Sequence, residues 1–592
     1  MYQDPLQSRL TPALVEAFQV LFEASVDPER IAFQATRPEF EGDLTVNVFP
    51  FLKVSGRGPE QTAQALGEHL QEHVSEVERF NVIKGFLNLV IADAYWIEYA
   101  RQALERDILA FPATGSKVMV EYASPNTNKP LHLGHLRNIF LGYSVSRILE
   151  AAGHEVVKVQ VINDRGIHIC KSMLAWQRFG KGETPESSGI KGDKLVGKYY
   201  VEFDKALKAE VEDLVAKGSD REKAEKEAPI LLAAQDMLRK WEAGDPEVKA
   251  LWEKMNGWVY FGFEATYRRA GVDFDRNYFE SETYVLGKQD VLEGLKKGVF
   301  YEKDGAVWVD NTAEGLDEKV LLRSDGTSVY MTQDIGTAIK RFEEYPGLSQ
   351  LIYTVGNEQD YHFKVLFIIL KKLGFPWADG LHHLSYGMVD LPSGKMKSRE
   401  GTVVDADDLI DEVVQEARRT GEQLSKLDAF STDEKDELFE MIGLAALKYY
   451  LLKVDPKKRM LFDPAASIDL QGHTGPFIQY TYARIQSVLR KAGSWTAQPL
   501  NVPLVAEELL VLKQLHQLPS ALHEAAAKLD PSAIANQTYE LVKAYNTMYQ
   551  VLPIAKEEDT ARRVFRLGLS KAVADAVRKA MWCLGIEVPE RM

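Results

Sequence analysis

A strand, a loop, a helix and a second strand follow one another within residues 117–162, and this order constrains the fold more than any other feature. KVMVEYA is an apolar strand, NIFLGYSVSRILEAAG has helical apolar spacing that closes at Gly153, and EVVKVQVIN is the next strand. A strand, a crossover helix and a strand of this length form a βαβ unit, whose two strands run parallel. The sequence therefore predicts an α/β domain built on a parallel sheet.

Composition shifts divide the rest of the chain into further units. Residues 1–110 read as a small α+β unit, with helical periodicity in LTPALVEAFQVLFEAS, strands in FEGDLTVNVFPFLK and FNVIKGFLNLVIA, and a linker in FPATGSK. We expect the parallel-sheet domain in residues 111–405, with a charged helical insertion at about 181–265. Alternation near AVWVD, SVYMT, LIYTVG and LSYGMVDL predicts its later strands. Residues 406–464 read as a helical connection and 465–592 as a helical bundle.

Cysteine content and hydropathy exclude several classes of protein. Cys170 and Cys583 lie far apart without a CxxC neighbour, which excludes a cysteine-built zinc site and argues against a disulfide framework. We therefore expect no structural metal and a reducing, cytoplasmic environment. The N-terminus lacks the long apolar run of a secretory signal, and the longest apolar stretch, Val365 to Leu370, is far short of the roughly 20 residues that span a bilayer. No membrane partner is expected.

The net charge of −16 argues, taken alone, against a nucleic-acid partner. The charge is unevenly distributed, however. Residues 465–592 sum to about +2, which leaves about −18 for the rest. Any binding to RNA must therefore depend on local basic patches, and the alternative is that an acidic protein avoids RNA.

The segment His132-Leu133-Gly134-His135 stands where the first strand leads into the first helix. A helix N-terminus offers free N–H donors and a partial positive charge, and ligands of open parallel sheets bind outside the carboxyl ends of the strands. Gly134 lets a nucleotide approach the backbone closely, and both histidines can donate to a triphosphate. The alternative is a helix-capping histidine with a chance neighbour.

A second candidate nucleotide loop, Gly394-Lys395-Met396-Lys397-Ser398-Arg399-Glu400-Gly401-Thr402, follows about 260 residues later. Mobile cations after a strand can close over a pyrophosphate as its charge develops. An isolated KMKSR would more often be a solvated run of charges. Its order after HLGH favours the catalytic interpretation.

The run VEYASPNTNKPLHLGHLRN closely resembles the HIGH region of arginyl-tRNA synthetases, which are class I enzymes with a Rossmann-type catalytic domain. GKMKSREGT resembles the class I KMSKS loop with one residue fewer before Ser398, so either Lys395 or Lys397 could meet the phosphates. In family members with a weak loop, a lysine placed like Lys129 compensates. The resemblance further implies that ATP is bound at His132, Gly134, His135, Gly356, His362, Gly387, Met388, Val389, Lys395, Lys397 and Ser398.

Recognition of an arginine side chain needs planar carboxylate partners. YMTQD at residues 330–334 resembles the family segment whose tyrosine and aspartate hold that side chain. By the same resemblance Glu121 supplies a second carboxylate, and Ser124, Asn126 and Gln359 complete the amino-acid site with Tyr330 and Asp334. The alternatives are that Tyr330 is strand core and that Asp334 caps the helix IGTAIKRF.

The C-terminal segment QGHTGPFIQYTYARIQSVLRK resembles the start of the family's DALR anticodon-binding domain, and the GDLTVNV and GFLNLVI strands resemble its N-terminal domain that touches the tRNA elbow. Exposed anticodon bases stack on aromatic rings while arginines meet phosphates. The candidates are Tyr539, Tyr545, Asn546, Tyr549, Arg562, Arg563 and Trp582. Tyr545 and Trp582 could equally be core residues of a bundle.

The resemblance implies a cytoplasmic, monomeric ligase that uses ATP with Mg²⁺ to activate L-arginine and transfers it to the terminal adenosine of tRNA-Arg, with bound tRNA required even for activation. One alternative is another class I synthetase of the glutamyl or lysyl type, which the SPN and YMTQD motifs disfavour. A small-molecule nucleotidyltransferase would leave the C-terminal bundle without a role. A synthetase-derived binding protein would not need intact HLGH and KMKSR.

Overall fold

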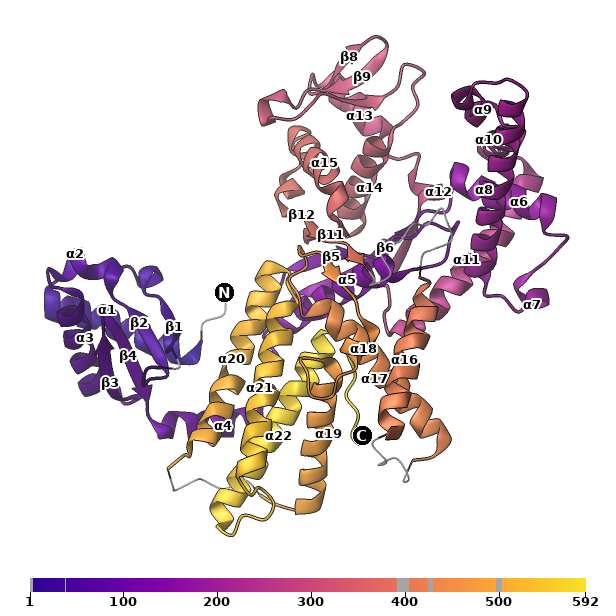
Figure 1. Cartoon of the computed structure of the whole chain (residues 1–592). Coiled ribbons are helices and arrows are strands. Elements are labelled where there is room, and N and C mark those ends of the chain that lie inside the picture. The colour runs from indigo at the N-terminus through magenta and orange to yellow at the C-terminus, as the bar shows by residue number, and fades with distance from the viewer. Residues whose placement is uncertain (1–3, 38, 391–403, 424–429, 497–502) are drawn as a thin grey trace.

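A five-stranded sheet forms the centre of the molecule (Figure 1), and all its neighbouring strands are parallel, in the order β12-β11-β5-β6-β7. The computed structural model describes residues 4–37, 39–390, 404–423, 430–496 and 503–592. The predicted parallel sheet is confirmed. Its strands are β5 Lys117–Glu121, β6 Glu155–Ile162, β7 Arg276–Phe279, β11 Leu348–Gly356 and β12 Leu381–Tyr386.

Helix α5, Leu133–Ala151, connects β5 to β6 and is buried along most of its length. Gly142 lets this helix approach the end of β5, because a Cβ built there would lie 2.3 Å from the Cβ of Tyr122. The apolar face of α5 also contacts the C-terminal helices. The close packing places the first turn of α5 at the carboxyl edge of the sheet.

Between β6 and β7 the chain forms a group of helices that includes residues 181–265. They are α6 Ile167–Phe179, α7 Pro185–Ser188, α8 Gly192–Ala216, α9 Arg221–Glu227, α10 Pro229–Glu242 and α11 Pro246–Ala270. The long pair α8 and α11 extends away from the sheet at the right of Figure 1. The predicted helical character of this insertion is confirmed.

A second small unit follows β7 and contains an antiparallel sheet, β10-β9-β8, which the sequence did not distinguish from the main sheet. The prediction of a strand at SVYMT is wrong, because helix α14, Tyr330–Glu344, begins within this segment. Its apolar residues Met331, Ile335 and Ala338 are buried with helical spacing. The other elements are α12 Glu280–Thr283, α13 Lys288–Lys296, β8 Tyr301–Lys303, β9 Ala306–Val309, β10 Lys319–Leu322 and α15 Asp360–Lys372.

The chain from residue 404 is mainly helical, as expected, with one short strand pairing. Strand β13, Val389–Asp390, pairs with β14, Met460–Leu461. The helices α19 to α22 form the bundle at the bottom of Figure 1. They follow the connecting helices, and the full series is α16 Ala406–Gln423, α17 Thr432–Leu452, α18 Pro464–Ser467, α19 Gly475–Ala492, α20 Ala506–Lys528, α21 Ser532–Val551 and α22 Thr560–Cys583.

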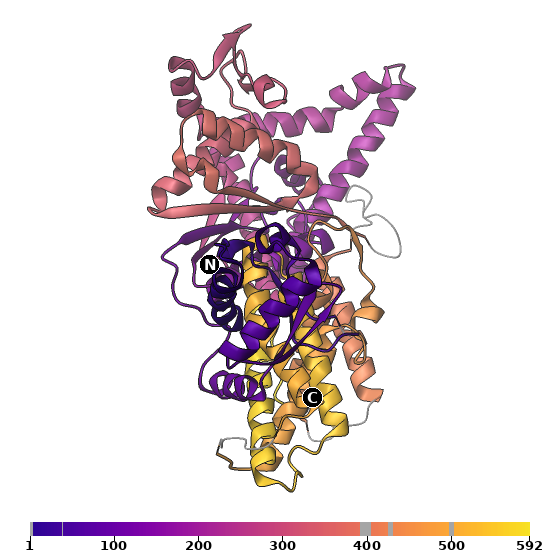
Figure 2. The ribbon, with the colours of Figure 1, turned by 90° about the vertical axis from the view of Figure 1, so that its left-hand side faces the viewer.

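The N-terminal unit lies beside the C-terminal bundle rather than beside the parallel sheet, as Figure 2 shows from the side. Lys513 on α20 forms an ion pair with Asp43, and the hydroxyl of Tyr99 donates to the Leu515 carbonyl. The unit contains an antiparallel sheet, β1-β2-β4-β3, on which α3 packs, and α1 packs against α3. Its elements are α1 Pro5–Phe22, β1 Phe33–Ala35, β2 Leu44–Asn47, α2 Leu52–Ser55, α3 Pro59–His73, β3 Val77–Ile83 and β4 Phe86–Ile91, and α4 Asp93–Glu105 follows.

Candidate active site

The two histidines of HLGH cap the N-terminus of α5. The Nδ1 atom of His132 accepts from the Gly134 N–H at 3.1 Å, and Nδ1 of His135 accepts from the His132 N–H at 3.1 Å. Because each Nδ1 is an acceptor, each neutral ring carries its proton on Nε2. The capping interpretation is thus correct, but it does not compete with a catalytic one, since both rings retain an Nε2–H donor.

Electrostatics keep this pair neutral. Burial, assisted by the Lys129 charge, lowers the pKa of His132 to about 3. Burial, with further contributions from His132 and Lys129, lowers the pKa of His135 well below its ordinary value. Burial also lowers the pKa of Lys129, whose charge acts on both rings. A cation and two neutral donors therefore gather at the start of α5, which suits a polyanion.

Two buried residues that follow HLGH hold the first turn of α5 in place, and no role was predicted for them from the sequence. Asn138 accepts from the Ala123 N–H at 2.6 Å and donates to the Thr354 carbonyl at 2.7 Å. Arg137 donates to the carbonyls of Pro456 and Lys458, both at 2.9 Å. An arginine and an asparagine in an otherwise apolar helical run, directly after HLGH, are the sequence signal that could have identified them.

A cavity of about 1060 Å³ opens at the carboxyl edge of the sheet, and Asn126 and Asn128 of the loop that leads into α5 line it. Of the residues predicted to bind arginine it brings together Glu121, Ser124, Asn126, Tyr330 and Asp334. It does not include Gln359, which lies exposed in the turn before α15. The two predicted carboxylates therefore face one cavity, from β5 and from α14.

One face of α14 lines the cavity. Tyr330, Asp334, Thr337 and Arg341 all line it and are spaced by three or four residues, so they form a single stripe on the helix. Asp334 lies inside α14, whose N-cap is Val329, so the capping alternative for Asp334 is wrong. Tyr330 is 76% exposed, which excludes strand core. His362 lies behind Asp334, with Nε2 2.7 Å from its Oδ2.

Glu121 faces the cavity from the last position of β5 and is 8% exposed. Its Oε2 lies 2.6 Å from Nη1 of the fully buried Arg341, and its Oε1 accepts from the Ser124 hydroxyl at 3.2 Å. Ala123 and Ser124, which follow, have φ of 68° and 44°, an uncommon conformation for two consecutive non-glycine residues. The turn brings the Ser124 hydroxyl back to Glu121. Sequence reasoning did not identify Arg341.

Glu280 is a further acid in this cavity that the sequence did not indicate. It follows β7 directly, and burial raises its pKa to about 7, with Arg165 opposing the shift while Asp164 and Asp334 add to it. Its position after a strand of the parallel sheet was the available signal. The described lining of the cavity contains five acids and four cations, namely Glu121, Glu242, Glu280, Asp325 and Asp334 with Arg165, Lys288, Arg323 and Arg341.

The backbone expected to contact adenine is partly engaged. The Gly387 N–H donates to the Pro456 carbonyl at 2.9 Å, the Met388 carbonyl accepts from the Met460 N–H at 3.1 Å, and Val389 pairs with Met460 in the strand ladder. The Gly387 N–H is therefore engaged, whereas the Met388 carbonyl can accept a second hydrogen bond, and the expected contacts with adenine stay a prediction. The Met388 side chain is 44% exposed. Gly356 is the last residue of β11 and caps the short 3-10 turn, Asn357–Gln359, that leads to α15 and His362.

The second loop, with Lys395, Lys397 and Ser398, lies outside the described residues, but the chain on either side of it is described. Before it, Asp390 pairs with Arg459, whose Nη2 donates at 3.0 Å. After it, Asp405 forms a β-bridge with His132, and the Ala406 N–H donates to the Leu131 carbonyl at 2.9 Å. The segment that follows the loop thus contacts HLGH.

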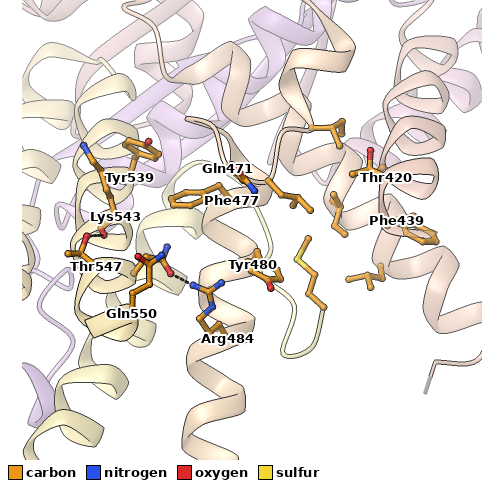
Figure 3. A pocket seen from close by; sticks show the side chains of 18 residues that line it. Thr420, Phe439, Gln471, Phe477, Tyr480, Arg484, Tyr539, Lys543, Thr547 and Gln550 are labelled. Atoms are coloured by element: carbon orange, nitrogen blue, oxygen red, sulfur yellow. Dashed lines mark hydrogen bonds between the residues drawn. The ribbon is translucent and has the colours of Figure 1, made fainter. Parts of the chain in front are cut away.

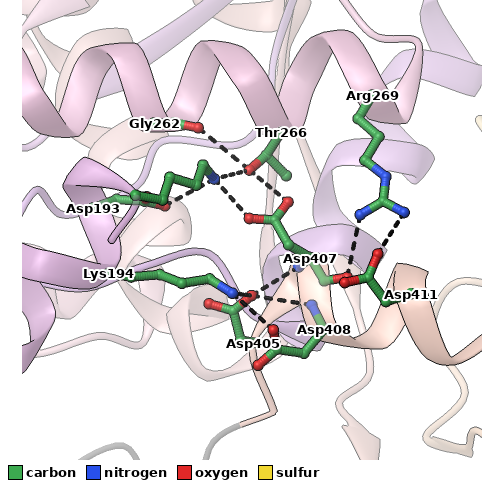
Figure 4. A network of polar contacts seen from close by, with 10 residues as sticks. Asp193, Lys194, Gly262, Thr266, Arg269, Asp405, Asp407, Asp408 and Asp411 are labelled. Atoms are coloured by element: carbon green, nitrogen blue, oxygen red, sulfur yellow. Dashed lines mark hydrogen bonds and ion pairs between the residues drawn. The ribbon is translucent and has the colours of Figure 1, made fainter. Parts of the chain in front are cut away.

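A polar network ties that segment to the helical insertion (Figure 4). The Nζ atom of Lys191 lies 2.7 Å from Asp407, and Nζ of Lys194 lies 3.0 Å from Asp405 and 2.7 Å from Asp408. Thr266 on α11 also donates to Asp407. These contacts hold the first turn of α16 beside α5.

A second cavity, of about 690 Å³, lies among α16, α17, α19 and α21 near the C-terminal Met592 (Figure 3). Tyr539, Lys543 and Asn546 line it from α21 and Arg484 from α19. Arg484 also lies over the ring of Tyr549, which is 39% exposed, at 5.0 Å. Two of the predicted RNA-facing residues, Tyr539 and Asn546, thus line a real cavity.

Three other residues predicted to face RNA, Tyr545, Trp582 and Arg562, do not line this cavity. Tyr545 is fully buried and its hydroxyl donates to Ser570, so it cannot stack on a base in this conformation and that expectation is wrong. Trp582 is half-buried beneath Arg147 and Lys579, in a separate cavity beside α4. Arg562 is half-buried and donates to the Pro503 carbonyl at 3.0 Å.

Family models match nearly the whole chain. Residues 102–463 match the class I (R) tRNA synthetase catalytic domain, 478–592 the DALR anticodon binding domain, and 5–91 the arginyl tRNA synthetase N-terminal domain. Curated arginine–tRNA ligases of Flavobacterium psychrophilum and Bacteroides thetaiotaomicron are each 55% identical, covering 99% of this chain and 100% of theirs.

Solved structures agree with these matches. The arginyl-tRNA synthetase of Thermus thermophilus superposes with a TM-score of 0.82 at 27% identity, over 99% of this chain and 100% of that one. The arginyl-tRNA synthetase of Plasmodium falciparum shares the fold, with a TM-score of 0.77 at 19% identity over 100% of both chains. The expectation drawn from HLGH and YMTQD is confirmed, and the chain belongs to the arginyl-tRNA synthetase family.

Proposed function

We propose that this chain is an arginine–tRNA ligase whose arginine side chain enters the cavity between Glu121 and Asp334. The observation that carries this proposal is the meeting of the two acids on one cavity, beside the N-terminus of α5. A guanidinium offers planar donors to both carboxylates. A neutral side chain would leave Asp334 without its charge partner, so selection needs no second site.

ATP would lie across the start of α5. The neutral Nε2–H groups of His132 and His135, the Lys129 ammonium and the helix N-terminus all favour phosphate. Lys395 and Lys397 would complete this charge. The arginine carboxylate is already ionised, so its attack on the α-phosphate needs no general base, only alignment and charge neutralisation.

Mg²⁺ would arrive with ATP as part of the substrate. Within the described ranges no cluster of three or more His, Cys, Asp or Glu side chains could hold a metal ion. The phosphates themselves would therefore supply the principal ligands, as usual for Mg²⁺ bound together with nucleotides.

The tRNA would span the molecule. The cavity with Tyr539, Lys543 and Arg484 offers an aromatic face and cations for anticodon bases and phosphates. The proposed units are 1–110 for the tRNA elbow, 111–405 for catalysis, 406–464 for the acceptor stem and 465–592 for the anticodon. We further propose a cytoplasmic monomer. No helix in the described parts of the chain is long and apolar enough to cross a bilayer.

Arginine-dependent exchange of pyrophosphate into ATP tests the proposal. Exchange should occur with arginine only when tRNA-Arg is present, and not with lysine or glutamate. Exchange with lysine or glutamate, or no exchange with arginine, would contradict the assignment. Transfer of labelled arginine to tRNA under the same conditions separates activation from transfer.

A further inference from the structure

The two acids of the proposed arginine site differ in one respect: Glu121 already has a guanidinium partner. Nη1 of Arg341 lies 2.6 Å from Oε2 of Glu121. Arg341 is 0% exposed, and the Glu121 side chain is 10% exposed. Asp334, in contrast, is 46% exposed and is contacted by His362.

Arg341 is held in a specific environment. Its guanidinium carbon lies 4.9 Å from the centre of the Tyr278 ring and 5.7 Å from that of Tyr353. These rings come from β7 and β11, and Arg341 itself is seven residues after Asp334 on the same face of α14. Three elements of the sheet domain therefore converge on one buried cation. Burial lowers and Glu121 raises its pKa, and the net effect is an increase.

A buried guanidinium destabilises the fold unless a carboxylate pairs with it, and a buried carboxylate destabilises the fold unless a cation pairs with it. Arg341 and Glu121 therefore balance each other while the cavity is empty. Oε2 is turned to Arg341, and Oε1 is held by the Ser124 hydroxyl. Both oxygens of the Glu121 carboxylate therefore have a partner before any substrate enters, an ion pair on Oε2 and a hydrogen bond on Oε1, which reduces the entropy lost on binding.

We propose that Arg341 is a positioning residue, which balances the charge of the Glu121 carboxylate and orients it for the substrate guanidinium. Asp334 then balances the positive charge of the substrate, while Glu121 supplies a fixed hydrogen-bond acceptor. This inference rests on the proposed assignment of the cavity to arginine.

The test compares Arg341→Met, Arg341→Lys and Glu121→Gln/Arg341→Met with the wild type in aminoacylation assays. Lys340→Met is the matched control, because Lys340 neighbours Arg341 on α14 but pairs with Glu344 away from the cavity. We expect Arg341→Met to raise the KM for arginine about tenfold or more and to change the KM for ATP less than about threefold. Arg341→Lys should recover part of the loss, because it restores a cation without the planar fork.

A pH profile separates positioning from folding. In Arg341→Met the buried Glu121 has no cation, so it binds a proton readily and must release it when arginine binds. The other charged groups of this cavity are Asp334, the cations Arg165, Lys288 and Arg323, and Glu280, whose pKa of about 7 gives the wild type a pH dependence of its own, so the two profiles must be compared directly. The KM for arginine in this variant should therefore rise as the pH falls from 8 to 6, more steeply than in the wild type. The double variant should lose that extra dependence.

Several outcomes would overturn the proposal. A folded Arg341→Met with wild-type KM values, an equal rise in both KM values, or a pH profile parallel to the wild type would show that Arg341 only supports the fold. If Arg341→Met does not fold, Arg341→Lys and the charge-neutral double variant answer the same question. Absence of arginine transfer by the wild type would instead count against the proposed function, and a rise in the KM for arginine in Lys340→Met equal to that in Arg341→Met would overturn the specific role of Arg341.

Discussion

The two cavities of this molecule differ in how their side chains are presented. The sheet-edge cavity takes Glu121, Glu280 and Asp334 from the ends of β5 and β7 and from one stripe of α14, where backbone geometry dictates direction. The bundle cavity takes Tyr539, Lys543 and Arg484 from helix faces whose exposure depends on packing against other helices. Strand ends thus define a site more reliably than helix composition does.

The largest expected effect lies in the sheet-edge cavity. Asp334→Asn keeps the shape of the side chain but removes the negative charge that would balance the substrate guanidinium. We expect kcat/KM for arginine to fall about 100-fold, or about 2.8 kcal/mol, with little change in the KM for ATP. Steady-state aminoacylation with each substrate varied measures this effect. An equal change in both KM values would remove Asp334 from the arginine site.

The second largest effect on catalysis is expected from substitutions at the start of α5. His132→Asn retains a good helix cap but loses the imidazole donor, so kcat should fall about tenfold to 100-fold with the KM for arginine nearly unchanged. Single-turnover activation assays would check it. A normal kcat would mean that His132 serves only as a cap.

The same variant tests stability against pH. Since the folded pKa of His132 is about 3, the unfolded chain binds more protons than the folded one between about pH 6.5 and 3, and stability falls as the pH falls through that window. The neutral, buried His132 ring should therefore lower the free energy of unfolding at pH 5 by about 2 kcal/mol relative to pH 7. The wild-type Tm should therefore drop more between pH 7 and 5 than that of His132→Asn, as followed by thermal unfolding. Parallel curves would contradict the neutral buried ring.

The bundle cavity should show a smaller effect, concentrated on RNA. Tyr539→Ala removes a ring that a base could stack on, and we expect the KM for tRNA to rise about tenfold, consistent with about 1–3 kcal/mol per stacked base. Tyr545→Phe is the control, because the buried hydroxyl bonded to Ser570 faces no cavity. Binding of labelled tRNA to each variant measures the difference. A larger effect at Tyr545 would reverse the assignment.

The smallest expected effect concerns salt. Lys543→Gln removes one cation from the bundle cavity and should reduce the slope of log affinity for tRNA against log salt by about 1. The affinity for arginine, measured at the same salt concentrations, should not depend on Lys543. An unchanged slope for tRNA would place Lys543 away from the phosphates.

The limits of sequence reasoning are clear at particular residues. HLGH was placed correctly because a strand followed by a helix leaves few positions for the loop between them. The prediction of a strand at SVYMT is wrong because five alternating residues do not exclude a helix start, and Tyr330 begins α14. Tyr545 was misread because the spacing of aromatic residues on α21 does not show which of them faces the core.

The sequence by itself determined the parallel sheet, the helical C-terminal region, the family and five residues of the sheet-edge cavity, Glu121, Ser124, Asn126, Tyr330 and Asp334, because local periodicity and contiguous motifs carry that information. Only the tertiary structure decided that Arg341 partners Glu121, that Pro456 and Met460 engage the backbone at Gly387 and Met388, and that Asp405 returns to His132. Each of these contacts joins residues that are far apart in the chain. Such pairings depend on how the elements pack, which no local pattern specifies.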